Sequence, residues 1–429
     1  MYLKQITLRN IMCFSEATLN FPPPGEAGNW CVVLGDNGTG KTTLLQAIAL
    51  TLAGPGGLLN RPANWISQGA DRAECEATFG LASGAERTTG YTIQNHRALL
   101  DETQAFQRQQ PLTRDDLPDD FVLAGYGALR RMAAGDVPTT DTSVIDALVN
   151  LFDDTQAIFD PDALLRKLDH NAKDPKKNRR LRLVSRDLRD GMLAIADSLL
   201  PTDPPFRIKG VSSGGVSFLA PGGQEVPLAA VSEGHRNVFA LAGNLIAFLW
   251  DQSFTPVDFK RAPDGSLFVD SPGIVLIDEV DLHLHPKWQR TIGKALQRVF
   301  PRIQFIVATH SPFVAQTANE GGLSVLRWEN GTVKAESPLP SMHALPAEEI
   351  LLGPAFGLET TRDPEIDALL REYVRLNALD LRGQLKAGDG KRLKELRKTL
   401  KGALPVDGNV YDTHTEVEFL VREAQKDND

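Results

Sequence analysis

Nine consecutive residues, Gly35 to Thr43, constrain this chain more than any other stretch. They read Gly-Asp-Asn-Gly-Thr-Gly-Lys-Thr-Thr and fit the phosphate-loop pattern G-x-x-x-x-G-K-[ST] at every fixed position. The apolar run Trp30–Leu34 before them predicts a buried strand, and the apolar spacing of Thr42–Leu52 after them predicts a helix. The sequence therefore predicts a strand, a glycine-rich turn and a helix that together bind a phosphate group.

The chemistry of this loop follows from its residue types. Glycines let backbone N–H groups curl around a phosphate because no Cβ intrudes, and the helix N-terminus adds partial positive charge. Lys41 is expected to reach the β- and γ-phosphates of a nucleotide, and the Thr42 hydroxyl is expected to ligate Mg²⁺. The residues expected to bind the nucleotide here are Gly35, Asp36, Asn37, Gly38, Thr39, Gly40, Lys41, Thr42 and Thr43.

Composition narrows the class of protein. The 429 residues suffice for two lobes plus an insertion, and the net charge of −9 argues against a broadly basic nucleic-acid coat, although not against a local basic groove. The three cysteines have no ligand or disulfide spacing. The N-terminus has no signal-peptide pattern and no apolar run approaches membrane-spanning length. We therefore expect a cytoplasmic protein with no membrane partner.

The first lobe is predicted to be rich in strands. Residues 2–8 alternate apolar and polar side chains and could pair as a hairpin with 17–21. Residues 74–79 and 90–94 are expected to be strands of the same sheet, and the polar stretch 101–120 a surface excursion.

From about residue 143 to 200 the pattern becomes helical. This segment holds the one dense basic cluster, Lys173–Arg182, with Arg186 and Arg189 beyond it. We favour a solvated helix face or loop over contact with nucleic acid or a partner protein. Residues 206–230 then predict two or three strands joined by glycine turns.

A second chemical motif is the apolar run Gly273–Ile277, which ends in Asp278 and Glu279. An apolar strand that ends in two carboxylates has the form of a Walker B segment. A strand buried on both faces presents these acids at its carboxyl end, where α/β sheets bind ligands. Asp278 is expected to hold Mg²⁺, and Glu279 to orient and deprotonate the attacking water.

A third motif is the apolar strand 304–309, followed by His310 and Ser311. An imidazole at the tip of a core strand could meet the γ-phosphate and the attacking water, and its place one strand after the acidic pair favours that function. His283 and His285 resemble a metal pair only weakly, so we interpret them as structural residues or subunit contacts.

The fourth motif, Val231-Ser232-Glu233-Gly234-His235-Arg236, opens an amphipathic helix that runs through Trp250. Ser232 is a natural N-cap, yet its hydroxyl and the Gly234 amide could instead grip a phosphate. Taken alone, the pattern favours capping.

In this order, the four motifs resemble the heads of ABC-type ATPases. The similarity is to the soluble SMC/RecF-like and OLD-like branch and, within it, to the ATPases of bacterial anti-phage systems such as Septu and its retron-linked relatives. It covers about residues 1–350 and depends on the segments LRNIMCF, GDNGTGKTT, SEGHRN, LIDEVDLHLHPKWQ and FIVATHSPFV. It implies an α/β P-loop head with an antiparallel β lobe, a mostly parallel core sheet, a helical insertion at about 143–200 and a helical C-terminal region at 351–429.

The resemblance also implies a mechanism. Such heads dimerise head-to-tail around two ATP molecules, so Ser232 and Gly234 would contact the γ-phosphate held by Lys41 of the partner subunit. It assigns the remaining roles as follows: Glu279 the catalytic base, His310 the switch residue, and Asp281 a neighbour of the partner in the loop after Walker B.

Two departures from the family pattern limit this transfer of roles. Val-Ser-Glu-Gly-His replaces the transporter-type Leu-Ser-Gly-Gly-Gln, so the transfer is safest for Ser232 and Gly234. No clear Q-loop glutamine follows the first lobe, and Tyr126 and Arg130 are our candidate substitutes.

The sequence after His310 separates the candidate activities. OLD-type nucleases carry a metal-dependent TOPRIM domain there, whereas this chain predicts a hairpin at 322–336 and helices at 366–385 and 391–400, without a TOPRIM set of acids. We expect an ATPase that acts with a separate effector such as an HNH nuclease, and with DNA or RNA as a further partner. The alternatives are a slow-turnover nucleotide sensor or scaffold, a DNA-repair-type ATPase and, less favoured, a transporter ATPase subunit.

Overall fold

The fold is described from a computed structural model. The residues that it describes are 1–25, 29–54, 65–97, 102–110, 112, 116–118, 120–132, 146–201, 205–252, 257–386 and 388–403. The chain divides into two compact units, Met1–Ile350 and Leu351–Asp429.

A six-stranded sheet forms the centre of the first unit, in the order β16-β15-β3-β14-β13-β7. Five neighbouring strands run parallel, and β16 at the edge runs antiparallel to β15. The strands are β3 (Asn29–Gly35), β7 (Val122–Tyr126), β13 (Gly273–Ile277), β14 (Ile303–Thr309), β15 (Leu323–Glu329) and β16 (Thr332–Leu339). Because β3, β13 and β14 are parallel, their carboxyl ends bring the phosphate loop, the acidic pair and His310 to one edge.

The second sheet is antiparallel, in the order β2-β1-β4-β5-β6. Its strands are β1 (Tyr2–Ile11), β2 (Phe14–Asn20), β4 (Arg72–Gly80), β5 (Glu86–Arg97) and β6 (Glu102–Gln109). The pairing of β1 with β2 confirms the predicted hairpin, and β4 and β5 are strands of the same sheet, as predicted.

The prediction of a surface excursion at residues 101–120 is wrong for Glu102–Gln109, which form strand β6. Strand β6 pairs antiparallel with β5, from Gly90↔Gln109 to Arg97↔Glu102. Its polar composition hid the strand, because an edge strand buries little and gains its order from the backbone ladder of its neighbour. Residues 101, 111, 113–115 and 119 lie outside the described part of the chain.

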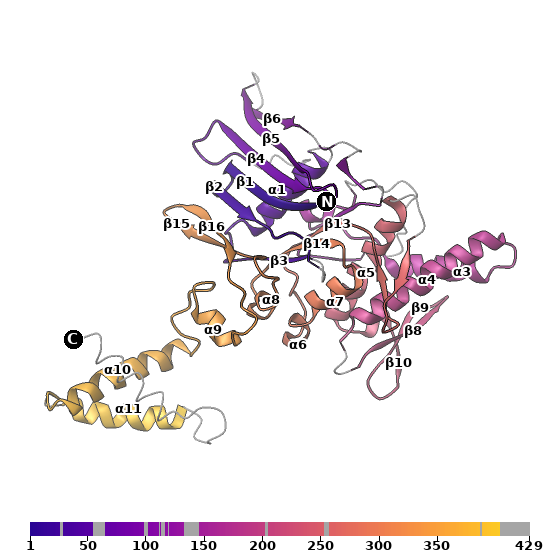
Figure 1. Cartoon of the computed structure of the whole chain (residues 1–429). Helices are drawn as coiled ribbons and strands as arrows, with labels where there is room; N and C mark the ends of the chain where they lie inside the picture. The colour runs from indigo at the N-terminus through magenta and orange to yellow at the C-terminus, as the bar shows by residue number, and fades with distance from the viewer. Residues whose placement is uncertain are drawn as a thin grey trace. The chain divides into compact units, whose positions relative to one another are not determined.

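Helix α1 (Lys41–Ala53) lies between the two sheets (Figure 1). Its Leu44, Leu45, Ile48 and Leu50 are buried in the same apolar cluster as side chains of β1, β4 and the core sheet. A helix that is apolar all round is stable only when both sides are covered. The sandwich of sheet, helix and sheet therefore fixes the N-terminus of α1 beside the carboxyl ends of the core strands.

The opposite face of the core sheet is covered by α5 (Glu233–Gln252), α7 (Ile292–Val299) and α8 (Pro312–Ala315), with the short helix α6 (Pro286–Gln289) beside them (Figure 1). Buried residues of α5 and α7 include Phe239, Leu245 and Leu296. The strand pair β11 (Phe259–Arg261) and β12 (Leu267–Val269) precedes β13.

The predicted helical insertion is confirmed for its described residues. It contains α2 (Val149–Phe152) and a hairpin of α3 (Pro161–Lys173) and α4 (Arg179–Leu199). The helical hairpin packs on α5 and on a small three-stranded sheet. The strands of this sheet confirm the strands predicted for residues 206–230. They are β8 (Arg207–Ser212), β9 (Gly215–Leu219) and β10 (Glu225–Pro227), and a 3-10 turn, η3 (Leu228–Ala230), follows them.

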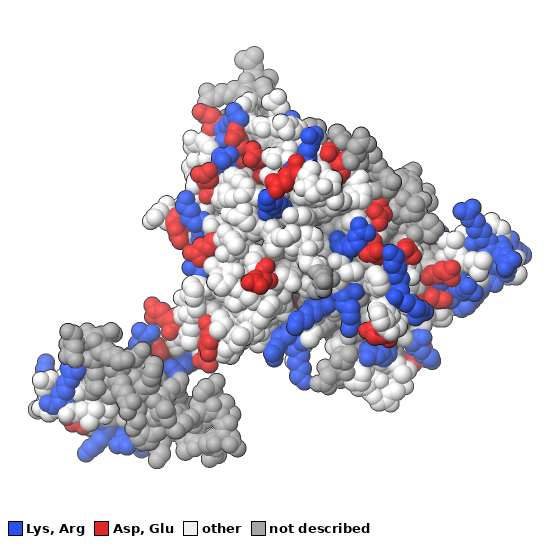
Figure 2. All heavy atoms as spheres, in the orientation of Figure 1, with Lys and Arg blue, Asp and Glu red and all other residues white. Residues whose placement is uncertain are grey.

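Basic side chains gather at the tip of the α3–α4 hairpin (Figure 2). We call this group the hairpin tip; its members are Lys173, Lys176, Lys177, Arg179, Arg180 and Arg182. All but Arg182 are exposed, and Lys173 is paired with Asp169 at 2.7 Å. The position on an exposed turn agrees with the solvated surface favoured from the sequence.

The β15–β16 hairpin is confirmed, with its turn at Asn330 and Gly331. Both residues have positive φ, 52° and 81°, which Asn and Gly adopt most readily. Helix α9 (Ala347–Leu352) follows β16. The second unit holds α10 (Pro364–Leu381) and α11 (Asp389–Ala403), which pack against each other. Their buried side chains include Leu370, Leu376, Leu396 and Leu400.

Candidate nucleotide site

The phosphate loop joins β3 to α1, as predicted, and its glycines are sterically required. Gly38 and Gly40 have φ of 78° and 83°. A Cβ on Gly40 would lie 2.5 Å from Cys13 Sγ, and one on Gly35 would lie 2.5 Å from Thr39 Oγ1. Larger residues would therefore strain the backbone or force the loop away from its neighbours.

Lys41 is fixed at the first turn of α1 and is only 6% exposed. Its ammonium donates to Gly35 O at 2.9 Å and Asp36 O at 3.3 Å, and lies 2.7 Å from His310 Nε2. Burial lowers the pKa of Lys41, and the carboxylates Glu279 and Asp278 oppose that change. The cation is thus held in place without a carboxylate at close hydrogen-bonding distance.

Thr42 and Asp278, which are far apart in sequence, meet across the α1–β13 junction. Thr42 Oγ1 donates to Asp278 Oδ2 at 2.5 Å, and Asp278 is buried. A hydroxyl and a carboxylate beside a phosphate loop are the oxygen donors that Mg²⁺ prefers. This donor set fits Mg²⁺, as the sequence predicts.

Glu279 and His310 lie beside Lys41. Glu279 Oε1 is 3.2 Å from His310 Nε2 and 3.9 Å from Lys41 Nζ. The Glu279 backbone has φ of 44°, a left-handed conformation that is uncommon for a residue with a side chain. Burial raises the pKa of the Glu279 carboxyl, and the charges of His310 and Lys41 oppose the rise.

The backbone of the acidic pair is held by Arg130. Its guanidinium donates to Asp278 O at 2.7 Å, Glu279 O at 3.1 Å and Gly127 O at 2.9 Å. Burial lowers the pKa of Arg130 to about 10, against the opposing effect of Asp278. Arg130 therefore acts on the site through the carbonyls behind the two carboxylates.

Tyr126 occupies a different environment from Arg130. It ends β7 and is fully buried, and its hydroxyl finds no hydrogen-bond partner among the described residues. It does not line the nucleotide cavity. Of the two candidate Q-loop substitutes, only Arg130 reaches the acidic pair through its side chain, whereas Tyr126 accepts from the Asp278 amide through its backbone carbonyl at 2.8 Å.

Asp281 lies on the same strand edge, where its carboxylate accepts a hydrogen bond from Thr309 Oγ1. The Thr309 hydroxyl also accepts from the Ser311 amide at 2.9 Å. His285 caps α6 by accepting from the Lys287 amide at 3.2 Å, so it has a structural role. Among the described residues, no group of three or more His, Cys, Asp and Glu side chains could hold a metal.

A cavity of about 640 Å³ opens over the phosphate loop. Its lining residues are Met12, Cys13, Asn37, Gly38, Gly40, Lys41, Thr42, Thr43, Ile66, Gln68, Glu279 and Trp328. Gln68 and Trp328 were not singled out from the sequence, because no motif marks them. A 51% exposed tryptophan on a core strand is unusual, but only the fold reveals its exposure.

Ser232 and Gly234 do not line this cavity. Ser232 is exposed, and its hydroxyl lies 2.6 Å from His235 Nδ1. A Cβ on Gly234 would lie 2.5 Å from His283 O, so the start of α5 packs closely against the loop after the acidic pair. The structure thus brings together Lys41, Thr42, Asp278, Glu279 and His310, and leaves Ser232 outside.

The family described as "AAA domain, putative AbiEii toxin, Type IV TA system" matches residues 31–315, from β3 to α8. The chain belongs to this AAA-domain family. The match includes the phosphate loop, the acidic pair and His310. The family match and the names of the chain's relatives together confirm the resemblance to ATPase heads of anti-phage systems.

Three curated relatives of this AAA-domain protein have informative names. The chain is 34% identical over 182 residues, 41% of its length, to "Retron Vc95 probable ATPase" of Vibrio cholerae, and covers 32% of it. It is 24% identical over 425 residues, 97% of its length, to "Septu protein PtuA" of Bacillus mycoides, and covers 52% of it. A "Septu protein PtuA" of Bacillus thuringiensis is 23% identical, with 87% of this chain and 88% of that protein covered.

The chain thus spans about a third of the length of the first relative and about half that of the second. Among solved structures, it is similar to an SMC head bound to the C-winged helix domain of ScpA, with 16% identity, a TM-score of 0.46, and 80% of this chain and 99% of that one covered. An SMC head domain from Thermotoga maritima gives 17% identity and a TM-score of 0.42, with 79% and 100% covered.

Proposed function

We propose that this chain binds and hydrolyses ATP, dimerises head-to-tail around the nucleotide, and thereby controls a nucleic-acid-directed partner in bacterial anti-phage defence. One observation carries the chemical part of this proposal. Lys41 Nζ, Glu279 Oε1 and His310 Nε2 lie within 3.9 Å of one another beside the phosphate loop. A phosphate-binding cation, a carboxylate base and an imidazole in that arrangement suit hydrolysis of a terminal phosphoanhydride.

The residues of this chain would divide the work as follows. Lys41 would contact the β- and γ-phosphate oxygens. Its ammonium has three N–H donors, which now face Gly35 O, Asp36 O and His310 Nε2, so it would exchange part of these contacts for phosphate oxygens. Glu279 would accept the proton of the attacking water, and its raised pKa makes it a stronger base than an ordinary glutamate. His310 contacts both groups and would hold the γ-phosphate end of the site.

Thr42 and Asp278 would hold Mg²⁺ at the edge of the cavity. When bound, the ion neutralises charge on the phosphate oxygens. The short Thr42–Asp278 contact keeps both oxygen donors on one side of the phosphate loop.

The start of α5 supports the head-to-tail dimer. Ser232 is exposed and lies outside the cavity of its own chain, and Gly234, two residues later, packs closely against the backbone of His283. An exposed hydroxyl at a helix start can reach a phosphate supplied by another molecule. In the proposed dimer, Ser232 and Gly234 would complete the γ-phosphate site of the opposite subunit.

The names of the retron and Septu relatives support a role in anti-phage defence. The separate effector, such as an HNH nuclease, is proposed from the family resemblance. DNA or RNA would most readily meet the hairpin tip, because its exposed Lys and Arg side chains can neutralise phosphates. None of the described helices is long and apolar enough to span a membrane.

Glu279→Gln tests the proposed function. The amide keeps the shape of the carboxylate but cannot accept the proton, so we expect steady-state hydrolysis to fall by about 10²–10⁴-fold with ATP binding retained. ATP should then trap a dimer, measured by light scattering, in which a crosslinker at Ser232 reaches the γ-phosphate held by the other subunit. The exposed Glu349→Gln is the matched control and should hydrolyse ATP normally.

Two results would contradict the proposal. Hydrolysis by Glu279→Gln within a few-fold of the wild-type rate would remove the assigned base. A crosslink from Ser232 to the nucleotide of its own chain, shown by mixing tagged and untagged subunits, would remove the head-to-tail arrangement while leaving ATP hydrolysis intact. A wild-type rate too slow to measure would instead favour the nucleotide sensor.

A further inference from the structure

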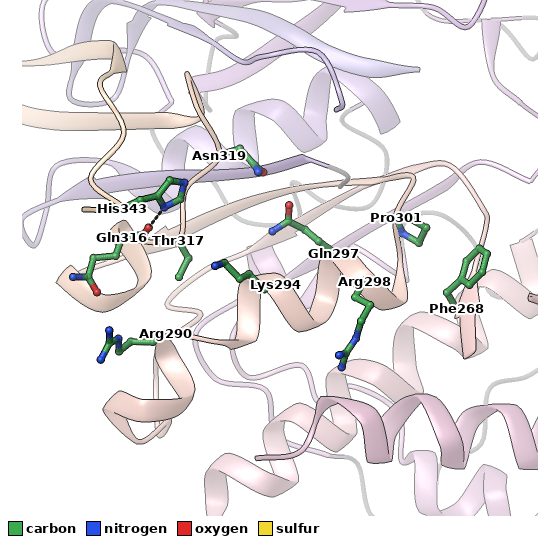
Figure 3. Close-up of a pocket in the computed structure, with 10 residues that line it drawn as sticks. All are labelled: Phe268, Arg290, Lys294, Gln297, Arg298, Pro301, Gln316, Thr317, Asn319 and His343. Carbon is green, nitrogen blue, oxygen red and sulfur yellow. Dashed lines mark hydrogen bonds between the residues drawn. The ribbon is translucent and has the colours of Figure 1, made fainter. Parts of the chain in front are cut away.

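A second cavity, of about 900 Å³, lies along α6 and α7 and shares no lining residue with the nucleotide cavity (Figure 3). We call it the α7 groove. Its lining residues are Phe268, Arg290, Lys294, Gln297, Arg298, Pro301, Gln316, Thr317, Asn319 and His343. The proposed ATPase chemistry uses none of them.

The α7 groove is basic. Arg290, Lys294 and Arg298 are exposed along one edge of it, and no Asp or Glu is among its lining residues. Within the described part of the chain, neither Arg290 nor Lys294 has an ion-pair partner, while Arg298 donates to Ser198 O at 3.3 Å. Figure 2 shows Lys and Arg side chains gathered over the α6–α7 region, on a protein whose net charge is −9.

The wall opposite these cations is held by hydrogen bonds. His343 Nδ1 contacts Gln316 O, and Gln316 Nε2 donates to Leu345 O at 2.6 Å. Asn319 Oδ1 accepts from the Trp30 amide at 2.5 Å, which anchors it to β3 of the core sheet. The groove is therefore bounded by a cationic helix on one side and by ordered polar residues on the other (Figure 3).

Gln297 supplies a second, independent indication of a ligand. Its side chain is only 6% exposed, and Nε2 donates to Gly293 O at 3.2 Å. Its Oε1, however, has no hydrogen-bond partner among the described residues. Buried acceptors are normally satisfied, so a ligand in the groove should offer an N–H or O–H group as well as negative charge.

We propose that the α7 groove binds an extended, acidic peptide segment of a partner protein. Lys294 and Arg298 are four residues apart in α7, or about 6 Å along the helix axis. Alternate side chains of an extended peptide lie about 7 Å apart on one face, so carboxylates at every second position match the two cations. The peptide backbone has an N–H at each non-proline residue, which can satisfy Gln297 Oε1.

A polynucleotide fits the groove less well. Its phosphate oxygens can pair with the three cations, but phosphate oxygens only accept hydrogen bonds, and the backbone of DNA has no donor that could satisfy Gln297 Oε1. The exposed hairpin tip, which carries no buried acceptor in need of a donor, is the better surface for phosphates. The α7 groove is therefore assigned to an acidic peptide and not to a phosphate backbone.

The test is a titration of the full chain, without nucleotide, against a fluorescein-labelled peptide of ten residues that alternates Glu and Ser. The matching Gln–Ser peptide is the uncharged control. The double variant Arg290→Glu, Lys294→Glu replaces two of the three cations of the groove with carboxylates, so we expect it to bind the acidic peptide at least about tenfold more weakly. The variant Lys176→Glu, Lys177→Glu makes the same change of net charge at the hairpin tip and should bind it as wild type does.

Gln297→Met separates a peptide from other polyanions, because it keeps the side-chain length but removes the acceptor. It should weaken binding of the acidic peptide about threefold to tenfold, and leave binding of a twenty-nucleotide oligo-dT unchanged. Absence of peptide binding at about 1 mM, or equal loss of binding for both charge-reversal variants, would overturn the proposal. So would oligo-dT that binds more tightly than the peptide and is released by Arg290→Glu, Lys294→Glu. Because nucleotide is omitted, none of these outcomes depends on ATP hydrolysis.

Discussion

The head has two motif-bearing regions that differ in how they are held. The phosphate-loop region is bonded within one chain: Lys41 contacts His310, Thr42 contacts Asp278, and Arg130 holds the backbone of the acidic pair. The start of α5, in contrast, presents Ser232 to solvent, with His235 of the same turn as its side-chain contact. Both regions carry residues of one family pattern, yet only the first forms a complete cluster.

This difference has a physical interpretation. Parallel core strands place groups from distant parts of the sequence at one edge, so the phosphate-loop region is assembled by folding alone. An exposed serine at a helix start gains little stability from its own chain. If the proposed dimer is correct, the second region is assembled only when nucleotide joins two heads, and substitutions in the two regions should separate ATP binding from dimerisation.

Ser232→Arg should give the largest separation. Bulk and charge at this position would block closure on the opposite γ-phosphate, so we expect ATP affinity to be kept while hydrolysis falls at least about 100-fold. Calorimetry measures ATP binding, and the rate of phosphate release measures turnover. The exposed Ser213→Arg, in the β8–β9 turn, is the matched control and should keep normal turnover.

Mixed dimers sharpen this test. A dimer of Ser232→Arg and Lys41→Ala subunits contains one composite site with both residues intact and one site that lacks both. We expect at most the turnover of that single site. Full wild-type activity of the Ser232→Arg variant alone would indicate that Ser232 only caps the helix. The start of α5 would then have no part in ATP hydrolysis.

Lys41→Ala should act in the opposite way, on binding. The variant removes the cation that is held by Gly35 O and Asp36 O, so the affinity for ATP should fall by about tenfold to 100-fold. The loss should be larger for ATP than for AMP, which lacks the β- and γ-phosphates. Equal loss for both nucleotides, or unchanged affinity in calorimetry, would contradict the assigned contact.

Much of this arrangement could be predicted from the sequence, because the phosphate loop and the acidic strand end are local patterns with fixed spacing. The partner contacts could not be predicted in the same way. The motifs predict that Thr42 and Asp278 share a Mg²⁺ ion, but Arg130 donates to Asp278 O across 148 residues, and nothing in either local pattern specifies that contact. Strand β6 was missed because its polar residues gain order from β5, and Trp328 because its exposure depends on the tertiary fold.

Arg130→Lys tests a contact that only the structure could define. A guanidinium reaches three carbonyls in a planar fork, and an ammonium cannot match that geometry. Because Arg130 positions the acidic pair without lining the cavity, we expect kcat to fall about tenfold with KM nearly unchanged. The neighbouring exposed Arg131→Lys should behave as wild type. A rise in KM alone would place Arg130 in substrate binding instead.

Trp328 should contribute the smallest effect, and it extends the comparison to the nucleobase. Its ring is 51% exposed and lines the cavity that holds the phosphate loop, so it is placed to pack against the base of a bound nucleotide. Trp328→Ala should therefore lower the affinity for ATP about threefold to tenfold, and Trp328→Phe should retain most of the wild-type affinity because an aromatic face remains. Inorganic tripolyphosphate has the phosphates without the base, so its affinity should not change in either variant. If the affinity for tripolyphosphate falls as much as the affinity for ATP, the Trp328 ring supports the phosphate loop rather than the base, and the base must be held elsewhere.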